Sequence, residues 1–209
     1  MTEFWNSNIT EASWLGLQEL NKEIDFVLIG GWATYLYTRL QKSKDIDVVV
    51  DYGTLRRLEG SYRLIKNERL RKYEIKKEKY DIDIYLPNYS KLALKPNDIL
   101  SKYRDSLGGF HVPIPEALMA LKLGAAADRG GSAKGEKDAI DILGLLFYSR
   151  MDLPRLNSVL AENGMQERLR LLLSILGNFD RRDLGYLNLN ESSFSKLKRE
   201  HSEGIRKLL

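Results

Sequence analysis

Two short apolar segments of the chain each carry two aspartates at alternate positions. The segment KDIDVVV contains Asp45 and Asp47, and the later segment YDIDIYL contains Asp81 and Asp83. Because side chains alternate between the two faces of a β-strand, each segment has one apolar face and one face that carries both aspartates. If the two strands are neighbours, three or four carboxylates meet on one patch of a sheet.

Such a patch requires compensation, because adjacent carboxylates repel one another and burial raises their pKa values. A divalent cation, Mg²⁺ or Mn²⁺, would supply it, since Mg²⁺ prefers oxygen ligands and is commonly held by one or two carboxylates plus substrate phosphates. Two such ions about 3.5–4 Å apart form a clamp for phosphoryl transfer. Either aspartate pair alone fits a sheet face exposed to water. Both pairs, together with the two glycines described next, favour a metal site.

Gly30 and Gly31 stand between a predicted buried strand at 25–29 and a predicted helix at 31–42. Glycine lets the backbone approach a ligand closely, and the free N–H groups at a helix start attract phosphate. A tight turn from strand to helix also needs glycine for its own sake. Because the next strand carries Asp45 and Asp47, the turn would place phosphates beside the carboxylates.

The order of elements predicts an α+β fold, with strands first and a helical C-terminal half from Pro96 onward. The first helix has Thr10 as its expected N-cap. Further strands are predicted at 44–50, 71–77 and 80–86, and helices at 11–23, 54–59, 97–106, 115–128, 135–149, 154–162, 166–178 and 191–208.

Composition narrows the class of protein further. The 209 residues are 43% hydrophobic and include no cysteine, which excludes disulfides, cysteine-based zinc sites and thiol nucleophiles. The polar N-terminus does not read as a secretory signal, and no apolar run is long enough to span a bilayer, so we expect a cytoplasmic protein without a membrane partner. Residues 56–79 hold ten Lys or Arg and four Glu. This basic segment fits a triphosphate or RNA partner, or a face exposed to solvent.

Taken together, these residues resemble the nucleotidyltransferase fold, the superfamily of DNA polymerase beta. The shared pattern is strand, Gly30-Gly31, helix, and a strand with Asp45 and Asp47. The resemblance implies a small mixed sheet with flanking helices, and a third carboxylate from a later strand. Asp83 is our choice for that carboxylate, with Asp81 as the alternative.

The helical half resembles the abortive-infection (AbiEii-like) toxin nucleotidyltransferases. PEALMALKL with Lys122, followed by Arg129 and then KDAIDIL with Asp138 and Asp141, looks like their K…R…KDxxDL pattern, and the resemblance covers about residues 25–146. It implies that the lysine and a downstream aspartate belong to the active site. An intramolecular salt bridge between Lys122 or Arg129 and the two aspartates is the structural alternative, and the two interpretations are compatible.

One departure from the family concerns the position after the double glycine. Many nucleotidyltransferases have Gly-Ser after the first strand, and this serine touches phosphate, whereas here Gly31 is followed by Trp32. Ser43, just before the strand that carries Asp45 and Asp47, is the expected substitute.

The resemblance implies a metal-dependent nucleotidyltransferase that moves a nucleoside monophosphate from a nucleoside triphosphate to a hydroxyl group. The implied acceptor is RNA, such as tRNA. The resemblance also implies the role of a toxin in a toxin–antitoxin pair, with an antitoxin protein as partner. Residues 1–110 would form the catalytic domain, and residues 111–209 a helical region that completes the active site. Alternatives are a binding module without turnover and a transferase that modifies protein hydroxyls. The expected catalytic residues are Asp45, Asp47, Asp83 and Lys122; the metal ligands are the same three aspartates; the nucleotide-binding residues are Gly30, Gly31, Ser43, Lys122, Arg129 and Asp138.

Overall fold

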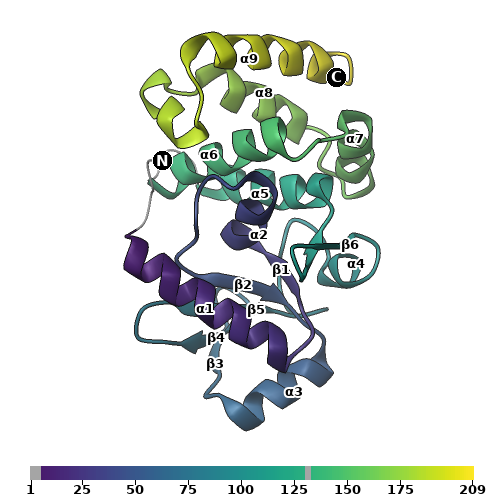
Figure 1. The fold of residues 1–209 in the computed structure, drawn as a ribbon. Coiled ribbons are helices and arrows are strands. Elements are labelled where there is room, and N and C mark those ends of the chain that lie inside the picture. The colour runs from purple at the N-terminus through teal and green to yellow at the C-terminus, as the bar shows by residue number, and fades with distance from the viewer. Residues whose placement is uncertain (1–5, 130–132) are drawn as a thin grey trace.

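The computed structural model describes residues 6–129 and 133–209. Its centre is a five-stranded mixed sheet with the spatial order β1-β2-β5-β4-β3 (Figure 1). The strands are short, as expected for segments that are bounded by turns or helices. Their bounds are β1 Val27–Ile29, β2 Ile46–Val49, β3 Ile65–Asn67, β4 Lys72–Lys76 and β5 Asp81–Tyr85.

The two strands that carry aspartates are neighbours, as the sequence pattern requires. Strand β2 pairs with β5 in parallel, whereas β1 pairs with β2, and β4 with both β5 and β3, in antiparallel fashion. Ile46 and Val48 of β2 and Ile82 and Ile84 of β5 alternate with the aspartates, so they point to the opposite face, where they are buried in the core. This burial fixes the register, because a slip by one residue would turn the aspartates into the core.

Helices surround this sheet and fill the second half of the chain (Figure 1). Helix α2 follows β1 directly and packs against α5 and α6, so it connects the sheet to the helical half. The helical half contains the pairs α5–α6 and α8–α9, whose members pack against each other. The helices are α1 Ser7–Glu23, α2 Gly30–Thr38, α3 Tyr52–Ser61, α4 Pro96–Leu100, α5 Pro115–Arg129, α6 Ala133–Tyr148, α7 Leu153–Glu162, α8 Arg168–Asn178 and α9 Glu191–Arg206, with a 3₁₀ helix η1 at Arg181–Leu187.

The α+β class with a small mixed sheet and a largely helical second half is confirmed, but the prediction of a helix at 97–106 is wrong. That segment forms the short α4 and then a hairpin of β6 Arg104–Leu107 and β7 Phe110–Pro113. Gly108 and Gly109 form its turn with φ of 61° and 84°, values that suit glycine. The sequence signal for this hairpin is therefore its Gly-Gly dipeptide.

The first helix begins earlier than predicted. Its N-cap is Asn6, whose side chain accepts a hydrogen bond from the backbone N–H of Asn8 at 2.9 Å. Thr10 lies inside the helix, where its hydroxyl donates to the carbonyl of Ser7. Both Asn and Thr are good N-caps, so the sequence offers two starts one turn apart, and the structure uses the first.

Candidate active site

A row of three carboxylates crosses the sheet. Asp47 of β2 is the register partner of Asp83 of β5, and Asp83 is the partner of Glu74 of β4. Neighbouring strands lie about 4.8 Å apart, so side chains from one row of a face are close neighbours. The sequence-predicted pair Asp47 and Asp83 is thus brought together, and Glu74 is a third acid that the sequence reasoning did not select.

The other two aspartates are held at the start of the same strands. Asp45 Oδ1 accepts a hydrogen bond from the backbone N–H of Asp81 at 3.0 Å, which ties the start of β5 to the segment before β2. The Asp81 carboxylate pairs with Lys76 Nζ at 2.7 Å. Asp83, rather than Asp81, therefore stands beside Asp47.

The absence of a side chain at Gly30 leaves room for the Asp47 carboxylate. The residue has φ of 67°, and a Cβ atom there would lie 2.2 Å from Asp47 Oδ2. Glycine is required on both counts, because L-residues avoid this conformation and the carboxylate leaves no room for a methyl group. The turn thus brings the backbone at the start of α2 against the acidic row, as the sequence predicted.

Gly31 makes a similar close approach on the neighbouring side. A Cβ atom there would meet Ser43 Oγ at 2.5 Å and would lie 3.4 Å from Lys137 Nζ. Ser43 Oγ itself donates to the carbonyl of Asp45 at 3.1 Å. The structure therefore places Gly31 and Ser43 side by side, next to the aspartate strand.

Trp32, which follows the double glycine, faces the core. It is buried, and its indole N–H donates to the Ser13 hydroxyl of α1 at 2.8 Å. The ring also packs against Trp14 of α1. This residue joins two helices and takes no part in the acidic row.

Burial and mutual repulsion raise the pKa values of two carboxylates of the row, Asp47 and Asp83. Burial, reinforced by the negative charge of Asp83, raises the pKa of Asp47 from 3.8 to about 6, although Lys122 and Lys72 oppose the rise. Burial raises the pKa of Asp83 as well, against the opposing effect of Lys72. A nearby cation stabilises the ionised form of both carboxylates in such a pair.

Two cations reach the row from different elements. Lys72, at the start of β4, contacts Asp83 Oδ2 and lies 3.1 Å from Glu74 Oε1. Lys122 comes from α5, and its charge acts on Asp47. Lys72 was missed at the sequence level because its partner depends on the register of β4, which single-sequence patterns do not reveal.

Lys122 also forms the predicted salt bridge within the helical half. Its Nζ lies 2.6 Å from Asp141 Oδ2 and 4.0 Å from Asp138 Oδ1. Lys137 Nζ shares the same Asp141 oxygen at 3.1 Å. Of the two aspartates of α6, Asp141 thus makes the closer contact, whereas Asp138 was the one selected from the sequence. Arg129 is the last residue of α5, and its side chain lies outside the described part of the structure.

The donor set suits a hard divalent cation such as Mg²⁺ or Mn²⁺. No group of three or more His, Asp or Glu side chains is arranged to hold a metal ion within residues 6–129 and 133–209. Mg²⁺, however, is usually bound by one or two carboxylates, with substrate phosphates and water completing its shell. Asp47 and Asp83 provide two carboxylates that repel one another, and this pair fits an ion that arrives with a nucleotide.

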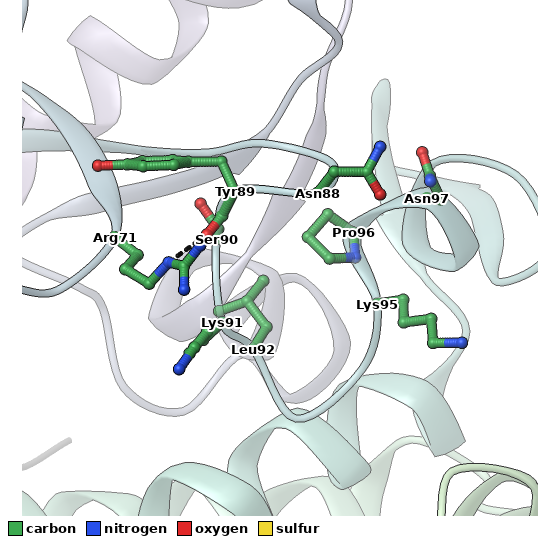
Figure 2. A pocket seen from close by; sticks show the side chains of 9 residues that line it. All are labelled: Arg71, Asn88, Tyr89, Ser90, Lys91, Leu92, Lys95, Pro96 and Asn97. Carbon is green, nitrogen blue, oxygen red and sulfur yellow. Dashed lines mark hydrogen bonds between the residues drawn. The ribbon is translucent and has the colours of Figure 1, made fainter. Parts of the chain in front are cut away.

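A basic pocket is formed by Arg71, just before β4, and by the loop that follows β5. Its volume is about 530 Å³, and Arg71, Lys91 and Lys95 are among its nine lining residues, none of which is acidic (Figure 2). Arg71 Nε donates to the carbonyl of Tyr89 at 2.7 Å. Arg71 directly precedes Lys72 in the chain, but none of the three acids of the row lines the pocket.

The comparisons with known proteins concern the fold. Neither the sequence profiles of known protein families nor the curated protein sequences give a match. The structure is similar to that of JHP933 from Helicobacter pylori, with a TM-score of 0.51 and 17% identity, over 97% of this chain and 94% of that chain. It is also similar, with a TM-score of 0.44 and 18% identity, to an antigenic nucleotidyltransferase-like protein from Paracoccidioides brasiliensis, over 80% of this chain and 92% of that chain.

Over residues 6–129 and 133–209, no helix combines the length and apolar character that a membrane span requires.

Proposed function

We propose that this chain is a metal-dependent nucleotidyltransferase that transfers a nucleoside monophosphate from a nucleoside triphosphate to a hydroxyl group. The observation that carries the proposal is the in-register pairing of Asp47 with Asp83 directly against the Gly30 turn. Pure nucleotide binding does not require two partly buried carboxylates that repel each other. Metal-assisted phosphoryl transfer does, because it needs oxygen ligands beside a place for phosphates.

Each residue of the site has a role in this proposal. Asp47 and Asp83, with Asp45 beside them, would hold Mg²⁺ or Mn²⁺. The bound ion would neutralise phosphate oxygens and help to ionise the acceptor hydroxyl. Gly30 and Gly31 would present backbone N–H groups to the phosphates, with Ser43 next to them.

The transfer itself follows from these positions. The acceptor oxygen attacks the α-phosphorus, and the bond from this phosphorus to the oxygen that bridges to the β-phosphate breaks, so that pyrophosphate leaves. Asp83 accepts the proton of the hydroxyl, a task that its raised pKa favours. Lys122 offsets the charge that develops on the phosphates. In this view, residues 1–110 supply the carboxylates, and residues 111–209 supply Lys122.

For the acceptor we propose RNA. The basic pocket supports this choice, because its three cations attract a phosphodiester backbone and none of its lining residues is acidic. A toxin role, an antitoxin partner and a cytoplasmic location stay predictions.

The test is transfer of label from each nucleoside triphosphate, labelled at the α-phosphate, with Mg²⁺ or Mn²⁺ and with total RNA or total protein as acceptor. Labelled RNA that disappears in Asp45→Ala and Asp47→Ala supports the proposal. Label on protein instead of RNA would support a nucleotidyltransferase activity but would overturn the proposal that RNA is the acceptor. Nucleotide binding without any transfer would make the chain a binding module.

A further inference from the structure

The acidic row contains a cation that belongs to the chain itself. The Lys72 side chain is only 11% exposed, and its ammonium group lies between Asp83 and Glu74. A buried lysine is costly unless it is paired, so this arrangement is a built feature of the row. Lys72 and Glu74 are two residues apart on β4 and therefore share the face that carries the row.

The two carboxylates beside Lys72 differ in how they are compensated. Glu74 also accepts from Lys76 Nζ at 3.0 Å and from Asn67 Nδ2 at 2.9 Å. Glu74 thus keeps two other donors when Lys72 moves, whereas the Asp83 oxygen that faces Lys72 becomes available only when that contact breaks.

We propose that Lys72 is an internal counter-ion that keeps Asp83 occupied until a metal–nucleotide complex arrives, so that the metal binds together with its nucleotide. The inference rests on the proposed function, because it requires Asp83 to be a metal ligand. A metal ion alone would have to displace Lys72 from Asp83 and leave the ammonium with less compensation. The phosphates of a nucleotide supply a new anion for it.

The geometry allows this exchange over a short path. A lysine ammonium has three donors, so Lys72 can keep its contact with Glu74 while another donor turns from Asp83 to a phosphate oxygen. Lys72 is therefore a positioning residue that sets the order of binding.

The test measures the binding of Mn²⁺ alone, without nucleotide, from the electron paramagnetic resonance signal of the free ion at pH 7.5. We expect Lys72→Met to bind Mn²⁺ about ten- to a hundredfold more tightly than the wild type, because a charge-assisted hydrogen bond no longer competes. Lys76→Met is the matched control, since it removes an equal charge from the same face of β4. It should bind Mn²⁺ like the wild type, and so should Lys72→Arg.

Two results would overturn the inference. One is an unchanged affinity of Lys72→Met for Mn²⁺. The other is an equal gain in affinity in Lys76→Met, which would show that removing any positive charge from this face has the same effect. Circular dichroism checks the fold of each variant, and Lys72→Gln replaces Lys72→Met if the latter does not fold. Adding Asp83→Asn to the Lys72 variant should abolish the gain.

Titration in the presence of a non-hydrolysable nucleoside triphosphate separates this inference from the proposed function. If the wild type binds Mn²⁺ tightly with the nucleotide, yet Lys72→Met gains nothing without it, only the role of Lys72 is contradicted. If the wild type does not bind Mn²⁺ even with nucleotide, the metal site and the inference fail together.

Discussion

At the scale of single residues, the pKa of Asp47 is shifted strongly by burial and by the neighbouring carboxylate. Its pKa is about 6 in the folded chain, compared with an ordinary value of 3.8. Because the folded pKa is the higher one, raising the pH ionises the unfolded chain first. The folded state therefore loses stability between about pH 4 and pH 6, and the loss is complete above that range.

Asp47→Asn removes this dependence because an amide does not titrate. From pH 4 to pH 7, the free energy of unfolding of the variant should rise relative to that of the wild type by up to about 3 kcal/mol. Urea unfolding at pH 4, 5.5 and 7 measures the difference. A difference that stays constant over this range would show that Asp47 is not strained by its neighbours.

Gly30 is the second residue on which the site depends. Gly30→Ala should destabilise the fold by about 1–3 kcal/mol, because alanine is strained at this φ and its methyl group would push Asp47 aside. Gly60→Ala is the control, since that glycine lies in α3 with nothing within 4 Å of an added Cβ, and it should be neutral or slightly stabilising. Thermal unfolding compares the two variants, and equal effects would contradict the close fit at Gly30.

At the scale of elements, the alternation of aspartates with β-branched residues predicts both β2 and β5 and the face they share. The alternation works because both faces of these strands are used, one for the core and one for charge. The polar β3 and β6 lack this contrast, and β7 has only four residues, so apolar patterning alone misses them. The contact between Lys72 and Asp83 depends on the pairing of β4, which no local pattern encodes.

The loop that follows β5 is the element on which the RNA proposal depends. It is held in place because Leu94 is buried and Ala93 packs against Gly124 of α5, while Lys91 and Lys95 stay exposed at the pocket. The packed residues therefore hold the backbone that carries the two lysines, in the loop that follows the strand of Asp83.

Replacing Lys91 and Lys95 by alanine together should weaken binding of a single-stranded RNA oligonucleotide and reduce its salt dependence. The expected decrease in the slope of log K against log salt is about 1 to 2, as for two lost phosphate contacts. The control is the double variant Lys196→Ala and Arg199→Ala, which removes two exposed charges from α9. Fluorescence anisotropy measures both, and an equal loss in the control would mean that the pocket has no special role.

At the scale of the whole molecule, the site lies where the sheet and the helical half meet. The sheet supplies Asp47 and Asp83, and α5 supplies Lys122, which α6 holds through Asp141. Motifs in the sequence predict these contributors separately. Their convergence depends on α2, which packs against β1 and β2 of the sheet and also on α5 and α6.

The rate of label transfer in Asp83→Asn compared with Asp81→Asn tests the central claim most directly. The two aspartates lie two residues apart on one strand and face, yet only Asp83 is the register partner of Asp47. We predict that Asp83→Asn lowers the rate at least about a hundredfold, as for the loss of a catalytic group, and that Asp81→Asn changes it only a few-fold. Full activity in Asp83→Asn, or an equal loss in both variants, would contradict the account.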